Sequence, residues 1–416
     1  MWQRILEDIT SGRHEQALIR LWLWAEGTEN GSQRLSVWRQ SFDRGEHVLK
    51  AETILAALER SPILLDADAA NYPLAVIEAL DWFLGLNPDL PGGRGSMTKV
   101  EEAGVGYWLL RRMPMPGVPA DRQEPNLEKW FRHFRVLPDR IAFGESAVEI
   151  DLVSVANPHG EDMTAPLSVR LSHFDDGVTT RFDERHESDT FWATGLDDEG
   201  KRLDSISAEL KAIGVVRDRV WVAPELTVTP GLRGRIGRLL ASEPLKQLLI
   251  AVPGSFHETA EGRQVNRAAI LDGDGAVLAH HEKLTLFSYP HAKTGRQTCE
   301  CIVAQRRITL LATPIGLVGV AICKDFSDET ATGLIQAVWN RLAPDWLLVP
   351  SMGDESTLRL HHACAESHAG LRGTRTAVAN QQAFDKEPRP GFVCFKKGTI
   401  ETVAPGGSSH ASGAEK

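Results

Sequence analysis

Three polar residues with types suited to nucleophilic catalysis each follow an apolar run that is typical of a buried strand. Glu225 follows Val220-Trp-Val-Ala-Pro224, Lys283 follows a predicted hairpin, and Cys323 follows the run from Leu317 to Ile322. Active sites in open α/β sheets gather at the carboxyl ends of strands. The shared placement therefore predicts that these three side chains meet at one site.

A thiol, a carboxylate and an ammonium group together could perform acyl transfer. A strand-to-helix turn favours the thiolate of Cys323, Glu225 could act as general base and acid, and Lys283 could bind an oxyanion. The backbone N–H of Lys324 would be the second oxyanion donor. The alternative is that Glu225 and Lys283 form a surface ion pair and that Cys323 is an inert core residue.

Three short motifs resemble those of the nitrilase (carbon–nitrogen hydrolase) superfamily, whose catalytic set is Glu, Lys and Cys in that chain order. They are Val222-Ala-Pro-Glu225, Glu282-Lys-Leu-Thr-Leu-Phe287 and Ile322-Cys-Lys-Asp325. Leu348-Val-Pro-Ser351 is similar to the segment that follows the nucleophile, and the resemblance covers about residues 165 to 400.

The resemblance implies an α/β fold, a nitrilase-like α-β-β-α sandwich, preceded here by a mostly α-helical N-terminal domain. It also implies hydrolysis of a non-peptide carbon–nitrogen bond through a thioester, without a cofactor. A small-molecule amide is favoured over a nitrile as the substrate, because amidases make up most of the family. Family members commonly pair two sandwiches, so we expect a homo-oligomer.

The sequence departs from the family pattern at two places. A second glutamate often follows the lysine closely, but here the next acidic residue is Glu300. We predict that Glu300 fills this role, with a structural salt bridge as the alternative. Lys324 stands where the family usually has an aromatic residue, and it either lines the pocket, where it would favour an acidic substrate, or faces solvent.

Two further residues are candidates for substrate binding. Tyr289 lies shortly after the lysine motif and could wall the pocket, with core packing as the alternative. Met352 directly follows a predicted strand end and could contact substrate.

Composition limits the other functional classes. The chain has 416 residues, enough for two domains, and a formal net charge of −10, which argues against nucleic-acid binding. It has no run of 18 apolar residues and no signal-peptide core, so we expect a cytoplasmic protein without a membrane span. Five cysteines without a Cys-x-x-Cys pair argue against a disulfide framework or zinc ribbon, and the paired histidines lack metal-ligand spacing, so we predict no metal.

Residues 1–135 are predicted to be helical, with segments from Val48 to Leu58, Pro73 to Leu86, Val100 to Arg112 and Asn126 to Arg135. Residues 136–164 form a strand-containing connector, residues 165–404 the hydrolase domain, and residues 405–416 a disordered tail. Asp272-Gly-Asp-Gly275 predicts a hairpin between two short apolar strands.

The N-terminal domain could bind a protein partner or associate with itself, since the family's hydrolases need no such domain. An alternative function is therefore that of a regulatory or scaffold protein, with the nitrilase-like domain as an effector or as an inactive module.

Overall fold

The computed structural model divides the chain into two compact units, Met1–Arg140 and Ile141–Lys416. The residues it describes are 2–26, 51–56, 73–86, 98–112, 131, 133–143, 146–155, 167–185, 189–290, 295–327, 333–381, 391–395, 400–402 and 408–411.

The first unit packs helices together with a small antiparallel sheet. Its helices are α1 (Trp2–Thr10), α2 (His14–Glu26), residues 51–56 and α5 (Pro73–Leu86). The sheet has the order β1 (Thr98–Glu102), β2 (Val105–Arg111), β3 (Phe134–Pro138). One cluster of buried apolar side chains joins helices and sheet, and it includes Ile5, Leu18, Leu80, Leu109 and Val136.

The helix expected from Val100 to Arg112 is wrong, because this segment forms the β1–β2 hairpin. Thr98 pairs with Leu109, and Ala103 and Gly104 at the turn both have positive φ. Valine, tyrosine and tryptophan favour strands, and a two-residue turn with positive φ matches the strand twist. The helix expected from Asn126 to Arg135 lies mostly outside the described residues, and its last two residues belong to β3.

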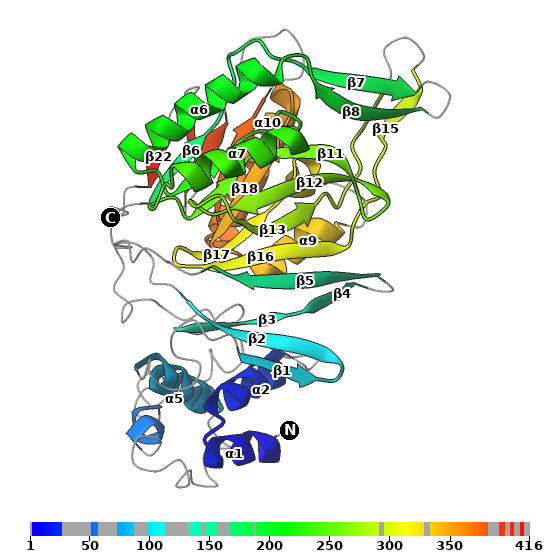
Figure 1. Ribbon diagram of the computed structural model, residues 1–416. Helices are drawn as coiled ribbons and strands as arrows, with labels where there is room; N and C mark the ends of the chain where they lie inside the picture. Colours follow the sequence, from blue (N-terminus) through cyan, green and yellow to red (C-terminus); the bar gives the residue numbers. More distant parts are fainter. Residues whose placement is uncertain are drawn as a thin grey trace. The chain divides into compact units, whose positions relative to one another are not determined.

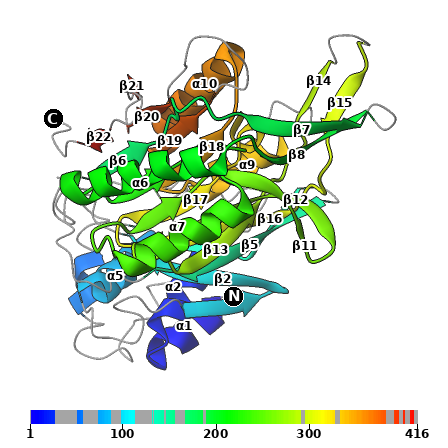
Figure 2. The same cartoon turned by 45° about the horizontal axis from the view of Figure 1, so that its top comes forward.

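The second unit is built on two large sheets (Figures 1 and 2). The first sheet has the order β11 (Ser255–Ala260), β12 (Arg263–Leu271), β10 (Ile250–Val252), β9 (Val220–Val222), β6 (Leu167–Leu171), β22 (Ser408–Ala411), and β13 (Val277–Glu282) pairs with β12. The second sheet has the order β21 (Ile400–Thr402), β20 (Phe392–Cys394), β19 (Arg375–Asn380), β18 (Trp346–Ser351), β17 (Gly316–Val320), β16 (Arg307–Thr313), β5 (Ser146–Ser154), β4 (Arg140–Phe143).

An apolar layer joins the facing sides of the two sheets. It contains Val169, Val220, Ile250 and Ile270 from the first sheet and Leu311, Val318, Leu348 and Ala377 from the second. The parallel strands β9, β17 and β18 are buried along their whole lengths, as expected for strands covered on both faces.

Helices cover the outer faces of both sheets. On the first sheet lie α6 (Glu199–Val216) and α7 (Pro230–Ser242), whose apolar stripes pack with Trp221 of β9. On the second lie α9 (Leu334–Leu342) and α10 (Glu355–Arg372) (Figure 1). A Cβ at Gly319 would stand 2.9 Å from the Trp339 ring, so glycine permits the close approach of α9. The expected α-β-β-α sandwich is confirmed.

Several details differ from the sequence-based boundaries. Within the expected connector 136–164, β5 pairs in parallel with β16 and is an integral strand of the second sheet. Within the expected disordered tail 405–416, Ser408–Ala411 forms β22, because the open edge of β6 offers backbone groups for pairing. The expected hairpin at Asp272–Gly275 is confirmed by β12 and β13.

A third, smaller sheet lies beside the sandwich with the order β14 (Ser288–Pro290), β15 (Gln297–Glu300), β8 (Thr190–Leu196), β7 (Thr180–Arg185) (Figure 2). It matters for the site because Glu300 is the last residue of β15. In the described part of the chain, no helix has the length and apolar character needed to cross a membrane.

Candidate active site

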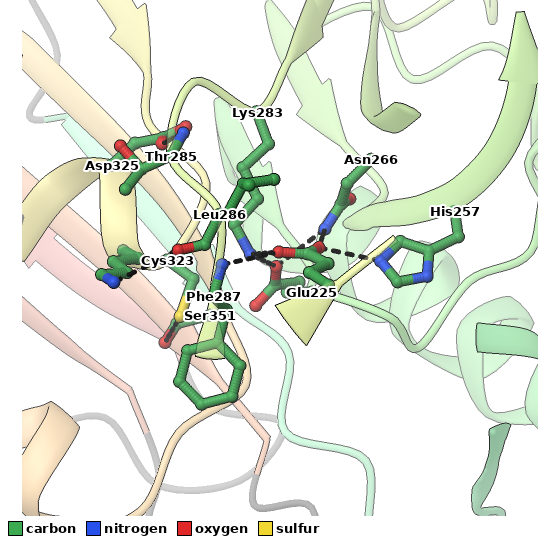
Figure 3. A network of polar contacts seen from close by, with 12 residues as sticks. Glu225, His257, Asn266, Lys283, Thr285, Leu286, Phe287, Cys323, Asp325 and Ser351 are labelled. Atoms are coloured by element: carbon green, nitrogen blue, oxygen red, sulfur yellow. Dashed lines mark hydrogen bonds and ion pairs between the residues drawn. The ribbon is translucent and has the colours of Figure 1, made fainter. Parts of the chain in front are cut away.

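The three sequence-predicted residues follow strands of the two facing sheets. Glu225 comes three residues after β9 and Lys283 directly after β13, both in the first sheet. Cys323 comes three residues after β17 in the second sheet, immediately before the short helix α8 (Lys324–Ser327). All three side chains are buried, with residue exposures of 2–4%. The carboxyl ends of strands thus bring them together, as the sequence predicts (Figure 3).

The ammonium group of Lys283 lies between two carboxylates. Its Nζ is 2.8 Å from Oε1 of Glu225 and 2.8 Å from Oε2 of Glu300. Burial lowers the pKa of Lys283, but the two adjacent carboxylates outweigh it and hold the pKa well above its ordinary value. Lys283 is therefore a fixed positive charge.

Each lone pair of the Glu300 carboxylate has a hydrogen-bond donor next to it. Oε2 accepts from Lys283 Nζ and from the Phe287 backbone N–H, at 2.8 and 3.1 Å. Oε1 accepts from Asn266 Nδ2 and lies 2.8 Å from His257 Nε2. Burial raises the pKa of Glu300, but Lys283 and His257 lower it further than burial raises it. Glu300 is thus a permanent anion with no spare lone pair for proton transfer.

Glu225 differs from Glu300 in how its oxygens are used. Oε1 accepts from Lys283 Nζ at 2.8 Å and from Asn266 Nδ2 at 2.9 Å. Among the described residues, no donor occupies its Oε2. One oxygen anchors the side chain, and the other is available to exchange a proton.

His257 and Asn266 complete the polar cluster, and the sequence alone did not single them out. The Ala193 N–H donates to His257 Nδ1 at 2.7 Å, so the ring proton is on Nε2 and is donated to Glu300. Asn266 holds Glu225 and Glu300 with one amide nitrogen (Figure 3). In the sequence, the only signal for these two residues is that each is a polar side chain at an inward-facing position of its strand, β11 or β12.

The backbone of Cys323 is strained, with φ of 48°, a region that non-glycine residues seldom adopt. Its N–H donates to the Pro350 carbonyl at 2.8 Å, and the Phe326 N–H donates to its carbonyl at 3.0 Å. These bonds hold the turn that presents the sulfur at the end of β17.

The thiol of Cys323 is protonated at rest. Burial and the nearby Glu225 raise its pKa to about 12, although Lys283 and Ser351 act in the opposite direction. The expectation that the strand-to-helix turn favours the thiolate is therefore wrong for the resting state. Burial outweighs the local backbone effect, so the sulfur could act as a nucleophile only with a base to take its proton.

Asp325 ties the cysteine turn to the lysine segment. Its carboxylate accepts the Leu284 N–H at 3.0 Å and the Thr285 N–H at 2.7 Å. Figure 3 shows Asp325 beside Thr285. Burial raises its pKa to about 7 despite these bonds. The Cys323 turn and the backbone that follows Lys283 are thereby held as one structure.

The stability contributed by Asp325 should depend on pH. The group titrates near pH 3.9 in an unfolded chain and near 7 in the fold, so its contribution is complete below about pH 4 and is lost as pH rises through about 7. Asp325→Asn removes the titration. The native-minus-variant free energy of unfolding, measured in denaturant, should fall between pH 4.5 and 8. A difference that stays constant with pH would contradict this.

The three residues predicted to bind substrate have different surroundings. Lys324 is half-buried, and its Nζ donates to the Leu286 carbonyl at 3.2 Å. The Tyr289 hydroxyl donates to Glu184 Oε1 at 2.9 Å. Its ring lies 6.1 Å from that of Phe287, which is 37% exposed.

The Met352 side chain packs against the apolar cluster beneath α6 and α7. Its backbone N–H, by contrast, acts to lower the pKa of the Cys323 thiol. For Met352, the backbone is therefore the part that influences the thiol.

One segment of the chain matches a known protein family. Residues 238–328 match the sequence profile of the carbon–nitrogen hydrolase family. This confirms the resemblance to the superfamily, and the segment includes the lysine and cysteine motifs. The matched segment contains Lys283, Glu300 and Cys323, whereas Glu225 precedes it. No protein with a curated function matches the chain.

Several solved structures are similar to this chain. An amidase from Nesterenkonia sp. is 17% identical, with 59% of this chain and 89% of that one covered and a TM-score of 0.41. Saccharomyces cerevisiae Nit3, a member of branch 10 of the nitrilase superfamily, is 16% identical, with 61% and 92% covered and a TM-score of 0.43. The C. elegans NitFhit protein is 16% identical, with 60% and 61% covered and a TM-score of 0.44.

Proposed function

We propose that this protein hydrolyses a non-peptide carbon–nitrogen bond of a small-molecule amide, with Cys323 as the nucleophile and a thioester as the intermediate. The observation that carries the proposal is the position of Lys283 Nζ, 2.8 Å from each of two buried carboxylates and within electrostatic reach of the Cys323 sulfur. The match to the carbon–nitrogen hydrolase family supports the reaction class.

In the first half-reaction, the Cys323 sulfur attacks the amide carbonyl while its proton passes to Oε2 of Glu225. The carbonyl oxygen becomes an oxyanion, which the Lys283 ammonium and the Lys324 backbone N–H stabilise. One such donor typically contributes about 10² to 10³ in rate. The intermediate then collapses, the carbon–nitrogen bond breaks, and Glu225 gives its proton to the leaving ammonia or amine.

In the second half-reaction, water replaces the sulfur. Glu225, again a carboxylate, takes a proton from water as the water attacks the thioester carbonyl. The carbon–sulfur bond breaks, the acid leaves, and Glu225 returns its proton to the sulfur, which restores the thiol and the carboxylate. Throughout, Glu300 stays ionised and holds Lys283 in place, because all of its accepting directions are occupied.

Glu225→Gln tests the base with two readouts that should move in opposite directions. Amide turnover should fall by about 10² to 10⁴, because the general base is lost. Modification of Cys323 by methyl methanethiosulfonate at fixed pH should become faster, because Glu225 is one cause of the raised thiol pKa. Glu258→Gln, which alters an ion pair with Arg233, is the control. Turnover of Glu225→Gln within a few-fold of the native rate would refute the role of base.

The expected homo-oligomer and the partner-binding role of the N-terminal unit stay predictions. The regulatory alternative differs from the hydrolase in turnover, since the Cys323 thiol is protonated at rest in either case. If the native protein consumes no amide in a broad panel, an inactive module is favoured.

A further inference from the structure

A buried chain of polar atoms leads away from the sulfur on the side that the proposed reaction does not use. Ser351, the last residue of β18, has its Oγ 3.6 Å from Cys323 Sγ and 3.1 Å from Nε2 of His361, which lies on α10. Ser351 and His361 are both 0% exposed. Figure 3 shows the Ser351 side chain next to the sulfur.

The second nitrogen of His361 determines the direction of this chain. Its Nδ1 is buried and has no hydrogen-bond partner in the described part of the protein. A buried N–H without an acceptor is rarer and more costly than a buried acceptor without a donor, so Nδ1 is the bare nitrogen. The ring proton is then on Nε2, from which it is donated to Ser351 Oγ.

With that bond made, the Ser351 hydroxyl proton is free to point at the sulfur. While the Ser351 hydroxyl donates to the sulfur, donation of the thiol proton back to Ser351 would place two protons between the same two atoms. The thiol proton is therefore directed elsewhere, and the charged groups that act on the sulfur are Glu225 and Lys283, of which only Glu225 can accept it. When the sulfur becomes a thiolate, the Ser351 hydroxyl is already oriented to stabilise it.

We propose that Ser351 and His361 form a positioning pair, which directs the Cys323 proton toward Glu225 and stabilises the thiolate as it forms. The consequence for catalysis rests on the proposed function, but the effect on the thiol does not. His361 stays uncharged in this role, since burial and the neighbouring His362 lower its pKa to about 3. Its ring packs against Phe326, 5.5 Å away, which supplies no charge.

The test follows the rate at which methyl methanethiosulfonate modifies Cys323 between pH 7 and 10, resolved by peptide mass spectrometry. The thiolate sulfur forms a mixed disulfide with the reagent and methanesulfinate leaves. No substrate or turnover is needed, so this test and the proposed function can fail separately. The full-length protein is used, and Cys394, a buried thiol whose pKa burial raises to about 11, is followed as an internal reference.

Ser351→Ala should slow the modification of Cys323 about tenfold at pH 8, the effect of losing one hydrogen bond to a charged atom. His361→Leu should also slow the modification of Cys323. His361→Gln should keep most of the native rate, because the glutamine amide N–H can replace Nε2–H. His368→Leu is the matched control, since His368 is also buried on α10 and packs on Phe326 but bonds to Gln336.

Unfolding would expose Cys323 and Cys394 and speed both reactions, so a slower reaction at Cys323 with an unchanged rate at Cys394 cannot come from a misfolded variant. Native rates in both Ser351→Ala and His361→Leu would overturn the proposal. So would a His361→Gln variant as slow as His361→Leu, because the ring would then act through packing alone.

Discussion

Cys323→Ala is expected to abolish turnover of any amide that the native protein hydrolyses, with a loss of about 10⁴-fold or more. No other described cysteine lies among the groups around Lys283 that could take over the attack. The fold should persist, since the change removes one small buried atom. Initial rates on a panel of primary amides, followed by ammonia release, give the activity, and thermal unfolding gives the stability.

Cys394→Ala is the matched control for this experiment. Cys394 is also buried in the second sheet, but its sulfur lies 3.7 Å from the Phe395 carbonyl and contacts none of the charged residues of the site. The Cys394→Ala variant should lose a similar amount of packing and keep the native rate of turnover. Native turnover in Cys323→Ala would exclude covalent catalysis by this residue.

Lys283→Met is expected to lose both activity and stability. Without the ammonium group, the oxyanion loses a donor worth about 10² to 10³ in rate. Two carboxylates then face each other in a buried site. Removing one partner of a buried ion pair typically lowers the free energy of unfolding by about 3–5 kcal/mol. Turnover and unfolding in denaturant measure the two effects separately.

The double variant Lys283→Met with Glu300→Gln separates electrostatics from packing. Removing one carboxylate relieves the repulsion left by the lost lysine, so the double variant should be more stable than the sum of the single effects predicts. The expected coupling is about 0.5–3 kcal/mol. Turnover should stay lost, because the oxyanion donor is still absent. Strictly additive losses would contradict the assigned ion cluster.

The assignment of different roles to two glutamates depends on their hydrogen bonds. Both lie 2.8 Å from the same ammonium group and are almost fully buried. Glu300 is held by four donors, whereas Glu225 has one oxygen without a donor among the described residues. Only a carboxylate with a vacant lone pair can accept a proton from a thiol or from water.

The local sequence determined the strand ends and the chemistry of the residues placed there. Apolar runs before Glu225 and Cys323 predicted buried strands, and the turn at Asp272–Gly275 predicted the hairpin that leads to Lys283. These signals are short-range, so they can be read from the chain. Periodicity was insufficient for Val100 to Arg112, where a short apolar segment fits both a helix and a hairpin and the sheet pairing decides.

Only the tertiary structure decided how the reactive groups behave. Asn266 and His257 are unremarkable polar residues in their own strands, and they gain a role because β11 and β12 bring them against Glu300. The thiol of Cys323 is protonated at rest because two packed sheets bury it, a condition that its neighbours in sequence do not specify. Proton affinity and hydrogen-bond direction depend on the atoms packed around a group, and most of these come from distant parts of the chain.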